Sequence, residues 1–72
     1  MENIKQIPLG ENIKRLRAWH NLSRYDLSKR TGIPIKTIEQ LEEHPPAVYL
    51  KNLIRIAEVF DVKIESLIND HA

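Results

Sequence analysis

Apolar residues recur along the chain at the three- and four-residue spacing of amphipathic helices. An early stripe contains Leu9, Ile13 and Leu16. A later stripe contains Leu50, Leu53, Ile54, Ala57 and Phe60. No stretch alternates between apolar and polar residues as a half-buried strand does, so the pattern predicts an all-α fold, a compact bundle of about five short helices. The expected helices cover residues 10–20, 24–31, 34–43, 49–60 and 64–69.

The second and third expected helices carry the pattern of two helices that meet at a sharp turn. Ser23 is followed three residues later by Asp26, a capping-box pair that marks the start of a helix. Gly32 permits the backbone to turn where a residue with a Cβ would be strained. Ile38 and Leu41, three residues apart, share a face that can pack against the preceding helix. This spacing predicts a helix-turn-helix.

Three short segments extend this pattern, LS at 22–23, TGI at 31–33 and TIEQLE at 37–42. With them, nearly the whole chain resembles the lambda-repressor/Cro-like (XRE-type) helix-turn-helix family of phage and bacterial regulators. In that family an arginine late in the first helix commonly pairs with a glutamate near the end of the third. The resemblance therefore implies a partly buried ion pair between Arg17 and Glu42, because a buried charge must be paired.

The same resemblance implies that the third helix enters the major groove of DNA, where side chains near its N-terminal end meet base edges. The matching positions are Ile35, Lys36, Glu39 and Gln40. Lys36 can donate to guanine, Gln40 can bond adenine, and Ile35 can touch a thymine methyl group. At the start of the second helix the resemblance implies a phosphate contact by Arg24, assisted by Ser23.

The first interpretation is therefore a sequence-specific transcriptional regulator of the phage repressor type. It would bind double-stranded operator DNA in a genetic switch such as the choice between lytic and lysogenic growth. One such helix reads few bases, so a homodimer on paired half-sites is expected. The candidate dimer elements are an N-terminal arm of residues 1–8 and the last helix, through Ile64 and Ile68. Residues 9–72 would form the helix-turn-helix domain.

The charge pattern departs from that of a strong DNA binder. The net charge is only +1, whereas nucleic-acid-binding domains are usually more basic. Many family members place basic residues after the third helix, but this chain has Glu43, His44, Pro45 and Pro46 there. Glu43 brings a negative charge, the prolines lack N–H donors, and Glu39 adds a negative charge to the presumed reading helix. Phosphate neutralisation supplies most non-specific affinity, so these departures favour a second interpretation.

In the second interpretation the protein is an antirepressor or modulator that binds the DNA-binding domain of a partner repressor through its own helix-turn-helix face. The DNA face of a repressor is basic, so carboxylates and apolar side chains would complement it. The candidate contact residues are Trp19, Tyr25, Ile35, Glu39, Glu43, Pro45, Pro46 and Val48. For Trp19 and Tyr49, covering a gap in the small core is an alternative role.

The composition argues against several other classes. There is no cysteine, so neither a disulfide framework nor thiolate chemistry is expected. His20, His44 and His71 stand far apart without the spacing of metal ligands. No phosphate-binding glycine loop or nucleophile–base motif is present, so we expect no enzyme activity, cofactor or small-molecule substrate. No apolar run suits a membrane span or signal peptide, so we expect a cytoplasmic location, in the host cell if the protein is phage-encoded.

Overall fold

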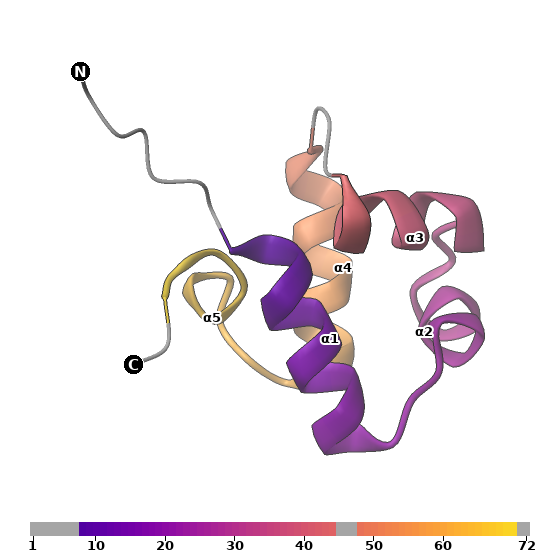
Figure 1. The fold of residues 1–72 in the computed structure, drawn as a ribbon, viewed down its shortest axis with the longest axis horizontal. Coiled ribbons are helices and arrows are strands. Elements are labelled where there is room, and N and C mark those ends of the chain that lie inside the picture. The colour runs from indigo at the N-terminus through magenta and orange to yellow at the C-terminus, as the bar shows by residue number, and fades with distance from the viewer. Residues whose placement is uncertain (1–7, 45–47, 71–72) are drawn as a thin grey trace.

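The computed structural model describes residues 8–44 and 48–70, and within these ranges it is entirely helical (Figure 1). Its helices are α1 (Leu9–His20), α2 (Arg24–Thr31), α3 (Ile35–Glu43), α4 (Leu50–Phe60) and α5 (Glu65–Ile68). The all-α prediction is confirmed, and each helix bound either agrees with the expected one or differs from it by one residue. Pro34 and Tyr49, expected inside helices, instead occupy the N-cap positions just before α3 and α4.

The ends of the helices follow from local residue chemistry. The hydroxyl oxygen of Ser23 accepts the backbone N–H of Asp26 at 2.9 Å, and the Asp26 carboxylate accepts the backbone N–H of Ser23 at 3.0 Å. The capping box that begins α2 is therefore present. The hydrogen bond from the Ser23 backbone lowers the pKa of Asp26. At the C-terminal ends of α1, α2 and α4, the left-handed cap conformation is adopted by Asn21, Gly32 and Asp61.

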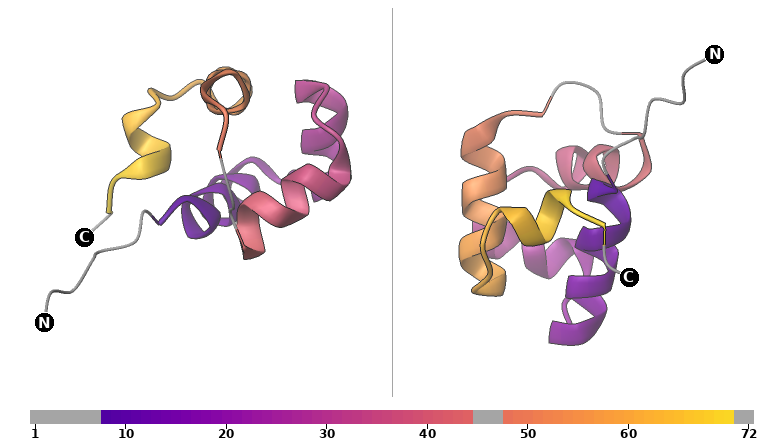
Figure 2. Two further views of the ribbon diagram at one scale, coloured as in Figure 1. Left: turned by 90° about the horizontal axis from the view of Figure 1, so that it is seen from above. Right: turned by 90° about the vertical axis from the view of Figure 1, so that its left-hand side faces the viewer.

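The helices enclose one apolar core. α3 packs against α1 and α2, α4 packs against α2, and α5 packs against α1. In the left view of Figure 2, α4 is seen end-on, with α5 to its left and α2 to its right. Every helix contributes to the buried apolar set, which consists of Leu9, Ile13, Leu16, Leu22, Leu27, Ile33, Ile38, Leu41, Ile56, Ala57, Phe60 and Leu67.

The buried face of α4 differs from the expected stripe. Within this stripe Leu50 is 62% exposed and Ile54 is 40% exposed, so neither belongs to the buried core. Ile56 is fully buried instead, together with Ala57 and Phe60. At 100° per residue these three positions define a face that leaves Leu50 and Ile54 at its edge. The spacing of apolar residues thus identified an apolar side of α4 but not which residues lie at the centre of its buried face.

The C-terminal segment is held against α1 by a buried amide. The side-chain Nδ2 of Asn12 donates to the carbonyl oxygens of Leu67 at 2.7 Å and Asn69 at 3.0 Å. Ile64 and Ile68 are partly buried against the same core. Much of the apolar surface of α5, the expected dimer element, is therefore already used inside the domain.

The backbones of α1 and α3 meet at Gly10. A Cβ atom built on this glycine would lie 2.1 Å from the backbone carbonyl oxygen of Glu42 and 2.8 Å from its carbonyl carbon. Neither backbone atom can move aside without displacing α3. Glycine is thus required here by the close approach of two helices, not by its own backbone angles.

We expect Gly10→Ala to lower the free energy of unfolding by about 3 kcal/mol, because the added methyl group forces α1 and α3 apart. Urea denaturation of wild type and variant measures this loss. Gly32→Ala is the matched control, since no atom lies within 4 Å of a Cβ at Gly32, but its φ of 77° disfavours alanine. That strain alone should cost about 1 kcal/mol. Equal losses in the two variants would show that the α1–α3 contact is not the tighter constraint.

Candidate nucleic-acid interface

The turn between α2 and α3 is fixed by two hydroxyl groups. The hydroxyl of Thr31 donates to the carbonyl of Leu27 at 2.7 Å and accepts the backbone N–H of Ile33 at 3.1 Å. The hydroxyl of Ser28 donates to the carbonyl of Ile33 at 2.5 Å. These contacts set the direction in which α3 leaves the turn, so they determine which side chains of α3 face solvent.

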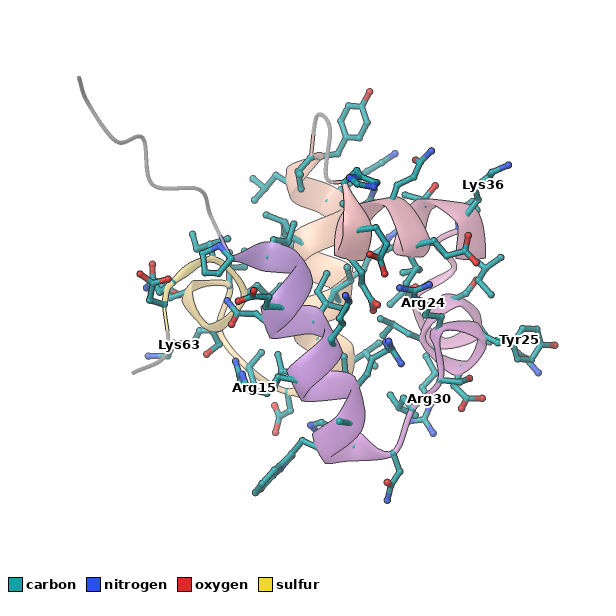
Figure 3. All side chains as sticks on the ribbon, viewed as in Figure 1. Arg15, Arg24, Tyr25, Arg30, Lys36 and Lys63 are labelled. Atoms are coloured by element: carbon teal, nitrogen blue, oxygen red, sulfur yellow. The ribbon has the colours of Figure 1, made fainter. Side chains whose placement is uncertain are left out.

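α3 turns one face to the core and the opposite one to solvent. Ile38 and Leu41 are buried, whereas the four expected base-reading residues are all exposed: Ile35, Lys36, Glu39 and Gln40. At 100° per residue these four positions fall on one side of the helix. Lys36 extends away from the domain near the N-terminal end of α3 (Figure 3). Within the described residues none of the four side chains forms a hydrogen bond or ion pair, so all are available to a ligand.

The exposed surface of α2 adds cations that the sequence analysis did not select. Tyr25 extends outward on the same side of the molecule as Lys36, whereas Arg30 lies on the side of α2 away from α3 (Figure 3). The ammonium group of Lys29 lies 5.4 Å from the centre of the Tyr25 ring, within the range of a cation–π contact. Lys29 and Arg30 are both exposed near the C-terminal end of α2. The exposure of Lys29 could have been foreseen from the helical period, because it lies about 200° around α2 from the buried Leu27, whereas Arg30, three residues after Leu27, gives no such signal.

A buried carboxylate lies at the C-terminal end of α3. The Glu42 side chain has no exposed area, and its Oε2 accepts Nε–H of Arg17 at 2.6 Å. Its Oε1 accepts Nη2–H of Arg17 at 2.9 Å and Nε–H of Arg24 at 2.9 Å. Arg17 also donates through Nη1 to the carbonyl of Leu22 at 3.1 Å. Arg17 and Glu42, the pair implied by the family resemblance, are thus in bidentate contact, and Arg24 joins them.

Arg24 has a second carboxylate partner in Glu43. Its Nη2 lies 2.5 Å from Oε2 of Glu43, and the ammonium group of Lys14 lies 3.4 Å from the same oxygen. Hydrogen bonds to Glu42 and then Glu43 raise the pKa of Arg24. The hydrogen bond from Arg24, followed by the charge of Lys14, lowers the pKa of Glu43. The arginine expected to contact phosphate is therefore engaged by two anions of its own chain.

The candidate partner-contact residues do not form one surface. Trp19 is 83% exposed and Tyr49 is 66% exposed, so the interpretation that they cover gaps in the core is wrong. Tyr25, Ile35 and Val48 are also exposed. Trp19, however, lies about 200° around α1 from Arg17, which faces Glu42 of α3, so Trp19 points away from α3. Pro45 and Pro46 lie outside the described residues.

The histidines occupy unrelated positions in the described parts of the chain. His20 places its ring 5.3 Å from that of Phe60, centre to centre. His44 caps the C-terminal end of α3, and His71 lies outside the described residues. In residues 8–44 and 48–70 no three histidine, aspartate or glutamate side chains are grouped so that they could hold a metal ion. Within these same ranges no helix has the length and apolar character needed to cross a membrane.

Comparisons with known sequences give a consistent result. A model of the Cro/C1-type helix-turn-helix DNA-binding domain matches residues 12–72. The chain is 40% identical over 59 residues to MJ0272 of Methanocaldococcus jannaschii, an uncharacterised HTH-type transcriptional regulator, which covers 82% of this chain and 89% of the relative. An uncharacterised HTH-type transcriptional regulator of Archaeoglobus fulgidus is 40% identical over 55 residues, covering 76% of this chain and 78% of the relative.

Two solved structures share the fold. The restriction-modification controller protein C.AhdI of Aeromonas hydrophila superposes with a TM-score of 0.78 at 23% identity, covering 85% of this chain and 92% of that protein. A transcriptional regulator of Listeria innocua also gives a TM-score of 0.78, at 22% identity, covering 94% of this chain and 64% of that protein. At these identities the likeness shows the arrangement of the helices alone.

The ion-pair geometry predicts unequal effects of its two arginines on stability. Arg17→Ala should lower the free energy of unfolding by about 3 kcal/mol, because it removes the bidentate partner of a buried carboxylate. Arg24→Ala should cost much less, because Arg17 still pairs both oxygens of Glu42. Urea denaturation of both variants at neutral pH tests this order. A larger loss in Arg24→Ala would contradict the assignment of Arg17 as the main counterion.

Proposed function

This chain belongs to the family of Cro/C1-type helix-turn-helix DNA-binding domains, and we propose from that premise that it regulates transcription by binding double-stranded operator DNA. The observation that carries this proposal is the outer face of α3. This face is exposed and mostly polar, and its side chains form no hydrogen bond or ion pair within the described residues. A helix whose apolar side is packed in the core, and whose polar side chains are not bonded within the protein, suits insertion into the major groove. The two archaeal relatives are named as HTH-type transcriptional regulators, which agrees with this role.

Base reading would come from the four exposed side chains of α3. The Lys36 ammonium group can donate to O6 and N7 of guanine, and the Gln40 amide can bond N6 and N7 of adenine. Glu39 can accept from the amino group of cytosine, while Ile35 can contact a thymine methyl group. Because α3 is anchored through Ile38 and Leu41, these side chains would be presented from a fixed backbone.

Phosphate contacts would come from α2. Arg24 begins this helix, and Lys29 and Arg30 extend the positive surface along it. Ser23 already accepts the Asp26 N–H with its hydroxyl oxygen, so its hydroxyl hydrogen is still available to a phosphate. These contacts carry no sequence information but would fix the register of α3 on the duplex.

Binding to paired half-sites as a homodimer in the cytoplasm completes this proposal. Ile64 and Ile68 retain some exposed surface at the edge of α5 from which a dimer could be built. A genetic switch fits a regulator of this size, and the phage setting stays a prediction. The relatives and structural neighbours described above come from archaea and bacteria.

Fluorescence anisotropy with labelled fragments of the source genome tests operator binding. We expect tight binding to a subset of fragments at about 50 mM salt and steep weakening at about 200 mM salt. Lys36→Ala should cost about 1–3 kcal/mol on the preferred fragment and relax its selection. Arg24→Ala should weaken binding to all fragments alike and flatten the salt dependence by about one unit of slope. Absence of binding at the lower salt concentration would overturn the proposal.

A second function is favoured by the negative charge on α3. Glu39 is exposed one turn from Ile35, Glu43 is exposed at the C-terminal end of α3, and the guanidinium of Arg24 is already neutralised by carboxylates. Such a surface suits the basic DNA-binding domain of a partner repressor, as an antirepressor or modulator would require. The antirepressor role is the alternative to direct DNA contact.

Charge reversal separates the two functions. The double variant Glu39→Lys, Glu43→Lys should bind DNA more tightly, because it removes two negative charges from the reading helix and adds two positive ones. The same variant should lose binding to a basic partner repressor, measured by pull-down with the candidate repressor at matched salt. If partner binding survives the double reversal, the carboxylates of α3 are not the contact.

A further inference from the structure

We propose that Glu43 competes with DNA phosphate for Arg24 and thereby lowers the affinity of the domain for DNA. The inference rests on the proposed DNA-binding function and assigns Glu43 a role within it. Its starting point is the ion-pair network at the end of α3. In this network Arg24, the cation at the start of α2 that is best placed to contact phosphate, is held by two carboxylates of the same chain.

Arg24 uses different nitrogens for its two carboxylates. Nε donates to Glu42 at 2.9 Å, and Nη2 donates to Glu43 at 2.5 Å. The side chain is only 29% exposed as a result. In Figure 3 Arg24 lies between α2 and α3, whereas Lys36 and Tyr25 extend outward. A phosphate on the α2–α3 surface would therefore meet a guanidinium that already donates through Nε and Nη2.

The two contacts of Arg24 differ in what they do for the fold. Glu42 is buried and keeps both Arg17 bonds if Arg24 moves away. Glu43 is 47% exposed and keeps the ammonium group of Lys14 at 3.4 Å. Exposed ion pairs contribute little to stability. The bond between Arg24 and Glu43 can thus be exchanged without leaving a buried charge unpaired.

A phosphate group is the natural competitor for this bond. The planar fork of a guanidinium matches two phosphate oxygens as well as it matches a carboxylate. While Glu43 stays ionised, it both occupies Nη2 of Arg24 and repels an approaching phosphate. Lys14 can hold Glu43 once Arg24 turns outward. The network therefore offers a bound and a released position for Arg24, with Glu43 favouring the bound one.

The test uses the full chain and a labelled duplex of random sequence, about 20 base pairs or two helical turns long. Random sequence suffices because phosphate contacts do not depend on sequence. Affinities are measured by anisotropy at about 50 mM salt for wild type, Glu43→Gln, Arg24→Ala and the double variant. Glutamine keeps the shape of Glu43 and removes its charge. Thermal melting by circular dichroism checks that every variant is folded.

We expect Glu43→Gln to bind about three- to fivefold more tightly than wild type, the factor set by an exposed ion pair. In the Arg24→Ala background the same change should give a clearly smaller gain, because only the repulsion between Glu43 and phosphate is then removed and no arginine is left to release. Glu58→Gln is the matched charge control. It removes the same charge from the exposed surface of α4, where Glu58 has no side-chain contact within the described residues. Its effect should stay below about twofold because salt screens distant charges.

The outcomes that overturn the inference are distinct. Unchanged or weaker binding by Glu43→Gln, with wild type binding normally, would overturn the role of Glu43 alone. An equal gain in both backgrounds would also overturn it, because the effect would then be general repulsion and not release of Arg24. No binding by wild type or any variant at about 50 mM salt would overturn the proposed function together with the inference.

Discussion

The burial of the Glu42 carboxylate is the constraint on which the arrangement of the first three helices depends. An ionised group without exposed area must be neutralised and hydrogen-bonded within the protein. Here the donors come from α1 through Arg17 and from α2 through Arg24. The backbone carbonyl of the same residue lies against Gly10 of α1. One residue of α3 therefore fixes both how closely α3 approaches α1 and how α2 is placed beside it.

This anchoring explains how α3 can combine rigidity with an open surface. Its inner side is taken up by Ile38, Leu41 and Glu42, and its outer side carries side chains with no internal role. The helical period separates most of the two sets, since positions 38 and 41 lie opposite positions 36, 39 and 40, while Ile35 lies at the border, about 20° around the helix from Glu42. The outer residues can change without disturbing the core. Variation of function on a constant fold needs this separation.

The sequence allowed the all-α fold, the helix bounds and the capping box to be predicted because these depend on residues close together in the chain. Prediction from the sequence failed for features that depend on how the helices cross one another. In α4 the helical period selected an apolar stripe that includes the exposed Leu50 and Ile54. It did not include Ile56, which is fully buried. Gly10 gave no signal, because its importance lies in the distance to a backbone 32 residues away along the chain. Both carboxylate partners of Arg24 were missed for the same reason.

The two proposed functions are linked through Arg24. Glu39 and Glu43 make the outer surface of α3 negative. While Arg24 stays between α2 and α3, its guanidinium is bonded to Glu42 and Glu43. In that state the surface suits a basic protein better than DNA. With Arg24 turned outward and Glu43 held by Lys14, the same surface gains a phosphate donor at the start of α2. The choice between partners then depends less on which residues are present than on which anion holds one guanidinium group.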